Sequence, residues 1–136
     1  MRRKRIQVLT MALLGFGALS GPATSQRPAL AMLDQLEPGR WEVRLRDGSG
    51  RTSQVCLDNG RKLIQLRHEA LICERLVVED RADQVTVQYT CRGRGYGRTT
   101  IRRETGRLVQ IQTQGIAEGL PFDFAAEARR MGDCGN

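Results

Sequence analysis

The fold class follows from the segment Val85-Thr86-Val87-Gln88-Tyr89-Thr90-Cys91, in which apolar and polar side chains alternate without a break. Alternation with a period of two is typical of a β-strand that has one buried face and one solvated face. The parity of this strand places Cys91 on the apolar face together with Val85, Val87 and Tyr89. The segment therefore predicts a half-buried strand that carries a cysteine on its apolar side.

Turn residues flank this strand, and further strands are predicted in both directions along the chain. The turns are Arg81-Ala82-Asp83 before it and the Gly93–Gly97 loop after it. The other predicted strands are residues 41–45, 51–57, 76–78, 98–103 and 107–115. Strands joined by short turns pair antiparallel with their neighbours, so the chain is predicted to be mainly β, an antiparallel β-meander of about six strands. The sequence leaves open whether this sheet closes partly into a barrel.

Helical segments and an ambiguous tail complete the expected architecture. Asp58 or Asn59 is placed to cap one short amphipathic α-helix around Leu63 to Leu71, and a shorter helix is expected around Ala29 to Gln35. Residues 125–131 suit a helix by propensity and a last strand by position. Trp41 is expected in the core, because Val43 and Leu45 share its face.

The N-terminus has the three parts of a secretory signal peptide. A basic run, Arg2-Arg3-Lys4-Arg5, precedes an apolar stretch from Ile6 to Leu19 and a group of small residues that ends at Ser25. Fourteen apolar residues would extend about 21 Å as a helix, less than the roughly 30 Å of membrane hydrocarbon. A cleaved signal is therefore favoured over an anchor, and no transmembrane span is expected in the mature chain.

The expected organisation follows from this signal. Residues 1–25 form a signal peptide that is cleaved after Ser25, residues 26–37 a leader segment, and residues 38–136 a disulfide-linked β domain in the periplasm. The whole chain has 22 Lys and Arg against 15 Asp and Glu, a net charge of +7, but four basic residues leave with the signal and reduce the net charge to +3. A net charge this small gives little reason to expect a nucleic-acid partner.

Four cysteines lie in the part of the chain that would survive cleavage: Cys56, Cys73, Cys91 and Cys134. Their spacings of 17, 18 and 43 residues contain no Cys-x-x-Cys pair, which zinc and redox sites usually have. Two disulfides are expected in an oxidising compartment, with no metal and no other cofactor. Four cysteines allow three pairings. The favoured one is Cys56–Cys73, which would clip the helix between two strands, with Cys91–Cys134 tying the tail to the sheet.

These cysteines stand in a frame that resembles a known family. Pro38-Gly39-Arg40-Trp41-Glu42 is similar to the Pro-Gly-x-Trp-Glu opening of the domain of unknown function 3617 family, a group of small exported Gram-negative bacterial proteins. Cys56-Leu57, the two later cysteines and the closing Arg130-Met131-Gly132-Asp133-Cys134 resemble its other landmarks. Asp58-Asn59-Gly60 departs from the Thr-Pro-Glu-like helix start of that family. The resemblance implies an exported, disulfide-linked, β-rich domain, and it implies no activity.

A run of arginines is the strongest sign of a binding function. Residues 92–107 contain six arginines and one acid, Glu104. Guanidinium groups suit phosphate or carboxylate, and an aromatic ring between them can stack on a base or sugar. The candidate anion-binding face consists of Arg92, Arg94, Tyr96, Arg98, Arg102 and Arg107. The sequence favours the simpler alternative, a solvated sheet face whose charges protect an edge from aggregation.

His68 is the only histidine, and with Ser49 or Ser53 it is the one candidate for nucleophilic catalysis. No Gly-x-Ser-x-Gly motif is present, and both serines lie in or beside a predicted hairpin turn, where serine is ordinary. No catalytic residue is therefore assigned, and His68 is expected to be solvated.

The expected function is that of a periplasmic, non-enzymatic protein with a binding or envelope-associated role. One alternative is an anion-binding module for lipopolysaccharide, polysaccharide or nucleic acid through the Arg92–Arg107 face. Another is a hydrolase or hydrolase inhibitor that uses His68 or an exposed loop. An anionic component of the cell envelope is the partner that the arginines suggest.

Overall fold

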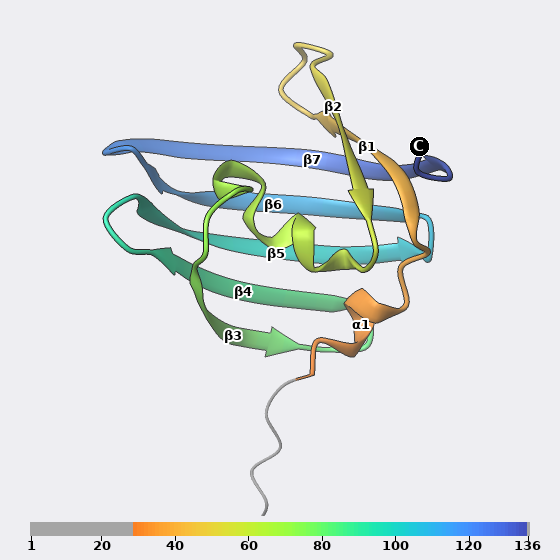
Figure 1. Ribbon diagram of the computed structural model, residues 1–136, viewed down its shortest axis with the longest axis horizontal. Helices are drawn as coiled ribbons and strands as arrows, with labels where there is room; N and C mark the ends of the chain where they lie inside the picture. Colours follow the sequence, from red (N-terminus) through yellow and green to blue (C-terminus); the bar gives the residue numbers. More distant parts are fainter. Residues whose placement is uncertain (1–28, 136) are drawn as a thin grey trace, which may run out of the picture.

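The computed structural model describes residues 29–135, which form one antiparallel sheet of seven strands, a short α-helix and a 3-10 helix (Figure 1). In chain order the elements are α1 (Ala31–Asp34), β1 (Gly39–Leu45), β2 (Thr52–Leu57), η1 (Gly60–His68), β3 (Glu74–Asp80), β4 (Gln84–Cys91), β5 (Gly95–Thr105), β6 (Leu108–Ala117) and β7 (Leu120–Gly132). The predicted mainly β, antiparallel class is confirmed. The predicted signal peptide lies outside the described residues.

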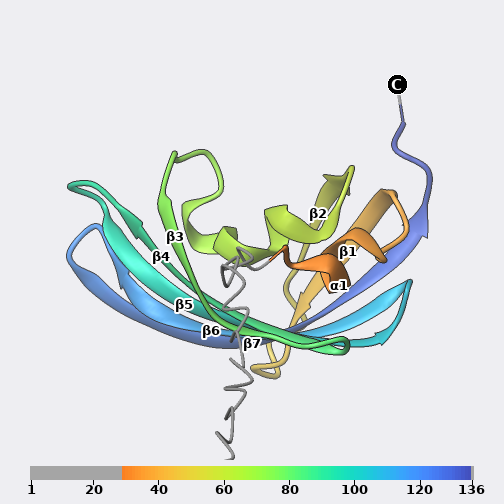
Figure 2. The same cartoon turned by 90° about the horizontal axis from the view of Figure 1, so that it is seen from below.

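The sheet is a simple meander only over its last five strands. Strands β3 to β7 follow one another in order, whereas β1 pairs with β7 and β2 forms the far edge. The chain therefore crosses from one edge of the sheet to the other, from β2 through η1 to β3. The sheet curves strongly around η1 and α1, and its two edge strands do not pair, so it does not close into a barrel (Figure 2).

The core occupies the concave face of the sheet, where the strand parity places it. Trp41 is fully buried, as predicted, and Cys91 lies on the same face as the buried Val85, Val87 and Tyr89. A Cβ atom at Gly97 would stand 2.4 Å from the Tyr89 hydroxyl oxygen, so glycine is required for the tyrosine ring to lie against β5. Helical residues complete this core: Met32, Leu33, Leu36, Leu63 and Ile64.

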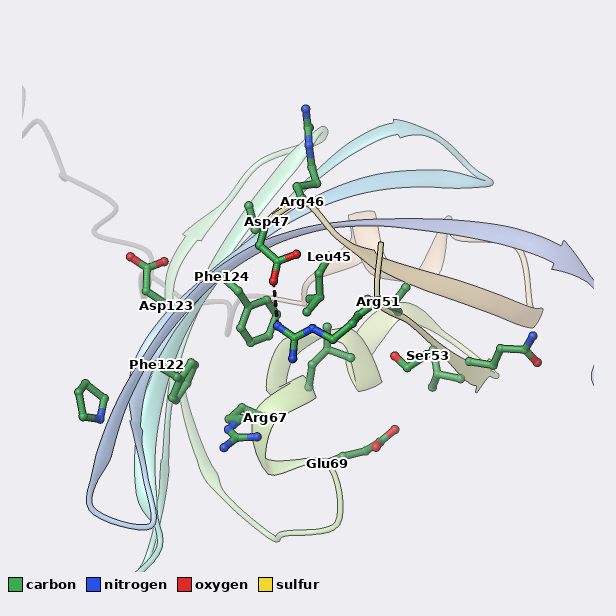
Figure 3. Close-up of a pocket in the computed structure, with 16 residues that line it drawn as sticks. Leu45, Arg46, Asp47, Arg51, Ser53, Arg67, Glu69, Phe122, Asp123 and Phe124 are labelled. Atoms are coloured by element: carbon green, nitrogen blue, oxygen red, sulfur yellow. Dashed lines mark hydrogen bonds and ion pairs between the residues drawn. The ribbon is translucent and has the colours of Figure 1, made fainter. Parts of the chain in front are cut away.

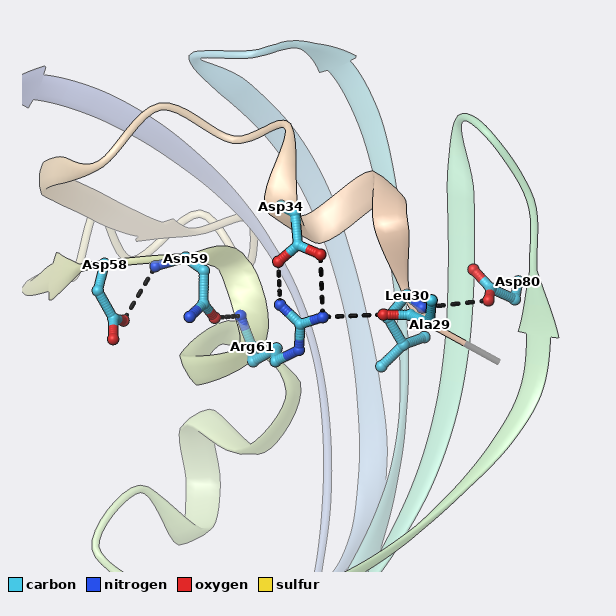
Figure 4. Close-up of polar contacts among 7 residues, drawn as sticks. All are labelled: Ala29, Leu30, Asp34, Asp58, Asn59, Arg61 and Asp80. Atoms are coloured by element: carbon cyan, nitrogen blue, oxygen red, sulfur yellow. Dashed lines mark hydrogen bonds and ion pairs between the residues drawn. The ribbon is translucent and has the colours of Figure 1, made fainter. Parts of the chain in front are cut away.

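Residues 29–37 are part of this core. The carboxylate of Asp34 pairs with the Arg61 guanidinium, which also donates to the Ala29 carbonyl at 2.8 Å (Figure 4). The Leu30 amide donates to the Asp80 carboxylate on β3 at 3.1 Å. The short helix expected near Ala29–Gln35 is thus present as α1, and it ties η1 to one edge of the sheet.

The segment predicted as an amphipathic α-helix is a 3-10 helix with a break. Asn59 caps η1 by accepting from the Arg61 amide at 3.0 Å, and the helix ends at His68. Gln65 has φ −126° and ψ 46°, which interrupts the helical hydrogen bonds. The helix therefore presents different side chains to the core than a regular amphipathic helix would, and His68 turns inward.

The ambiguous tail is a strand. β7 covers residues 120–132 and lies between β1 and β6. Its backbone finds hydrogen-bonding partners on both sides, which outweighs the helix propensity of its alanine, glutamate and arginine residues.

Two disulfides form, as predicted, but the favoured pairing, Cys56–Cys73 and Cys91–Cys134, is wrong. The bonds are Cys56–Cys134 and Cys73–Cys91. Register explains the difference: Glu74 is opposite Thr90, which brings Cys73 and Cys91 together across β3 and β4. On the other side, Arg40 of β1 has Cys56 and Gly132 as its two neighbours, so Cys134 reaches Cys56 over β1.

Candidate functional site

A pocket of about 810 Å³ opens on the concave face, between the end of η1, the β1–β2 hairpin and the start of β7 (Figure 3). Eight apolar residues from all three elements line it: Val43, Leu45, Val55, Leu66, Pro121, Phe122, Phe124 and Ala125. Several of them are only partly buried and pack against the edge of the core. The pocket is therefore the part of the concave face that η1 leaves uncovered.

An aromatic row forms one wall of this pocket. The Phe122 ring lies 6.0 Å from the buried His68 ring and 6.1 Å from the Phe124 ring, centre to centre. Both phenylalanines alternate with Pro121 and Asp123 along β7, so that they face the concave side. The row connects the buried His68 to the pocket.

The rim carries charges of both signs. The Arg51 guanidinium donates to the Asp47 carboxylate at 2.8 Å, as Figure 3 shows. Hydrogen bonds from Ser49, together with this guanidinium, hold the pKa of Asp47 well below its usual range. Within residues 29–135, Arg67 and Glu69 on the opposite side of the rim have no ion-pair partner. The pocket can therefore take an apolar group in its floor and a polar group at its mouth.

His68 is buried, and the prediction that it is solvated is wrong. Its side chain lies between η1 and the sheet, with Nδ1 3.1 Å from the Tyr89 hydroxyl and Nε2 3.3 Å from the Arg94 carbonyl. A carbonyl only accepts, so Nε2 carries the proton and Nδ1 accepts from the tyrosine. Burial raises the pKa of Tyr89, which keeps this donor protonated.

Neither candidate serine is a partner of this histidine. Both ring nitrogens are engaged by Tyr89 and Arg94, and the Ser49 hydroxyl instead bonds to Asp47 within the hairpin turn. Ser53 lies on the pocket wall. The arrangement described here places no nucleophile beside a base.

The six residues of the predicted anion-binding face do not form one cluster. Arg98 and Arg102 lie on the convex side of β5 with Thr100 between them, as predicted, and Tyr96 is half exposed on the same strand. Three of the arginines pair with acids: Arg94 with Glu118, Arg102 with Glu104 and Arg107 with Glu37. Arg92 is exposed at the end of β4. The positive charges of these arginines are spread along the 11 residues of β5 and its flanking turns. Their electrostatic potential is therefore not focused at one site.

The pocket residues were not anticipated from the sequence. The signal that was present is the alternation Phe122, Phe124, Ala126 and Ala128, which marks one face of a strand. This pattern is informative only once residues 120–132 are recognised as a strand rather than a helix. The contribution of Leu66 depends on the break at Gln65 and has no local signature.

Two further properties limit the chemistry of the described part of the chain. Among residues 29–135 no group of three or more His, Cys, Asp or Glu side chains is arranged to hold a metal ion. No helix in this range is both long and apolar enough to cross a membrane.

Comparison of the chain with protein-family models, curated proteins and solved structures finds no match in any of the three. The resemblance to the domain of unknown function 3617 family therefore stays a prediction.

Proposed function

We propose that the protein is a non-enzymatic binding protein that holds the apolar part of a small ligand in the concave-face pocket. The observation that carries this proposal is the pocket itself, about 810 Å³, with eight apolar residues among the sixteen that line it. Ligand sites in proteins typically have volumes of about 300–1,000 Å³, mostly apolar walls and a few polar groups at fixed positions. The mixed charges of the rim favour an amphiphilic ligand over a purely apolar one.

We infer that this binding takes place in the periplasm, after removal of residues 1–25. Two disulfides fit an oxidising compartment, and the basic and apolar N-terminus fits an export signal. An intact mass of protein recovered from the cell envelope tests this inference, because cleavage after Ser25 predicts a chain that begins at Gln26. A cytosolic protein with its first 25 residues present would contradict it.

The binding function is tested with N-phenyl-1-naphthylamine, a neutral dye whose fluorescence rises in apolar surroundings. We expect saturable binding to the purified protein and about tenfold weaker binding to Leu66→Gln, because an apolar contact worth about 1–2 kcal/mol is replaced by an amide. Leu66 lines the pocket from the end of η1.

The matched control is Leu76→Gln on β3, because Leu76 is 64% exposed and lies outside the pocket. This variant should bind the dye like the unmodified protein. Equal weakening in both variants, or fluorescence that rises in proportion to dye without saturation, would contradict the proposal. Independently of the dye, a mass spectrum of the protein under native conditions would identify any ligand that stays bound during purification.

A further inference from the structure

A second cleft, of about 630 Å³, lies between β2, η1 and the start of β3. We call it the basic cleft; five of the side chains that line it are Arg61, Lys62, Gln65, Glu69 and Arg75. It adjoins the concave-face pocket, since both are lined by Gln54, Val55 and Glu69. Three of its side chains are cationic, and each of the three has different surroundings.

Gln65 fixes one of these cations in place. Its side chain is 95% buried, and its amide nitrogen donates to the His68 carbonyl at 3.0 Å and to the Leu71 carbonyl at 2.7 Å. Both amide hydrogens are therefore used, which turns the amide oxygen toward β3. That oxygen accepts from Arg75 Nη2 at 2.8 Å. The interrupted backbone of η1 at Gln65 is what brings this amide into position.

Arg75 is the cation without a countercharge. Arg61 is occupied by Asp34 and by the Ala29 carbonyl, as Figure 4 shows, and Lys62 donates to the Cys56 carbonyl with Asp58 3.8 Å away. Within the described residues no carboxylate pairs with Arg75, whose one hydrogen bond is to neutral Gln65. Burial lowers the pKa of Arg75, and the positive charge of Arg61 adds to the lowering. Three acids, Asp34, Asp58 and Glu69, balance the three cations in number, so what distinguishes Arg75 is a guanidinium that no carboxylate of the described residues pairs with.

We propose that the basic cleft binds a phosphate group, with Arg75 as the residue that recognises it. The guanidinium of Arg75 has further N–H groups besides the one that bonds to Gln65, and a guanidinium can hold two oxygens of one phosphate at once. Arg61 lines the cleft beside it, but its donors are engaged by Asp34 and Ala29 and its charge is paired with the Asp34 carboxylate. Glu69 also lines the cleft and opposes an anion, so its charge limits the affinity.

The test follows the Nε–Hε resonance of Arg75 by NMR while inorganic phosphate is added to the full-length mature protein. We expect a saturable shift of this resonance. Arg75→Gln should weaken phosphate binding by at least about tenfold, the effect of losing a charge-assisted hydrogen bond. Arg129→Gln is the matched control, because Arg129 is an exposed arginine on β7 that lines neither the basic cleft nor the concave-face pocket.

A second variant keeps the proposal testable if Arg75→Gln disturbs the fold. Glu69→Gln removes a negative charge from the exposed wall of the cleft and should strengthen phosphate binding severalfold. No saturable shift in the unmodified protein, undiminished binding by Arg75→Gln, or a loss in Arg129→Gln as large as in Arg75→Gln would each overturn the proposal.

The source of the phosphate is distinguished by a parallel titration with monomeric dihexanoyl phosphatidic acid. Binding tighter than that of inorganic phosphate, with shifts of Phe122 and Phe124 as well as Arg75, identifies a lipid headgroup. Equal affinity, with shifts confined to the basic cleft, identifies free phosphate or a small phosphate ester. Both outcomes support a phosphate site, and neither depends on dye binding in the neighbouring pocket.

Discussion

The imidazole of His68 joins three parts of the molecule: the end of η1, strand β4 through Tyr89 and the β4–β5 loop through the Arg94 carbonyl. His68→Ala would remove the imidazole that bonds to the Tyr89 hydroxyl, whereas the Arg94 carbonyl would keep its bond from the Glu118 amide. We expect the free energy of unfolding to fall by about 3 kcal/mol, from the lost hydrogen bonds and the cavity together. Urea denaturation followed by circular dichroism measures this loss.

The neighbouring Arg67 provides the comparison for this variant. Arg67 is exposed and has no ion pair within residues 29–135, so Arg67→Ala should change the stability by less than about 0.5 kcal/mol. A similarly small effect of His68→Ala would show that its two hydrogen bonds contribute little.

The burial of this histidine was not predictable from its sequence neighbours. His68 ends a basic amphipathic segment, and this position led to the prediction that it is solvated. The break at Gln65 changes the geometry of this segment, and Gln65 is held by the His68 and Leu71 carbonyls, groups that only the folded chain brings together. Trp41, in contrast, was predicted to be buried, because its burial depends on strand parity alone.

At the level of elements, the Cys56–Cys134 disulfide secures one edge of the sheet. It joins β2 to the residues after β7 and spans β1, over a sequence separation of 78 residues. Replacing both cysteines by alanine should lower the stability by about 4 kcal/mol, because a long loop is no longer closed in the unfolded chain. Urea denaturation gives the loss, and faster hydrogen exchange in β2 would locate it.

The second disulfide provides the comparison for the first. Cys73–Cys91 has a sequence separation of 18 residues, so its removal should cost about 3 kcal/mol by the same reasoning. Peptide mapping without reducing agent checks the pairing itself, and a Cys56–Cys73 peptide would contradict the structure.

Most strands were predictable, whereas their spatial order was not. In the segments around Trp41–Leu45 and Val85–Cys91, apolar and polar residues alternate so regularly that the local sequence predicts a β-strand. Pairing depends on the path of the chain, and β2 is followed by a crossing to the opposite edge rather than by a neighbouring strand. The favoured pairing placed Cys56 beside Cys73 across the helix, and it was wrong because β2 and β3 lie at opposite edges of the sheet.

For the whole molecule, the two proposed sites share one structural origin. The sheet curves around η1, but this helix is short and broken, so it covers only part of the concave face. The uncovered parts on its two sides are the concave-face pocket and the basic cleft. Neither was predictable from the sequence, since each is lined by residues from strands and turns that are distant in the chain.

The free energy of unfolding of the whole molecule should depend on aspartate and glutamate carboxylates that are ionised in the folded protein. Hydrogen bonds lower the pKa of Asp34 through Arg61, of Asp47 through Ser49, of Asp58 through the Asn59 amide, of Glu79 through Gln84 and of Glu127 through Gln110. A carboxyl group with a lowered folded pKa stabilises the protein fully above its unfolded pKa of about 4, and the effect is lost as the pH falls through the folded value.

We therefore expect the urea midpoint to stay constant from about pH 7 to 5 and to fall steadily below about pH 4. Each group is solvent-exposed and contributes little alone, so the decline reflects their sum. Asp34→Asn removes the ion pair between α1 and η1, and it should lower the midpoint at pH 7 and make the acid decline shallower. A midpoint that rises on acidification, or an acid profile identical in both proteins, would show that these carboxylates do not control the stability.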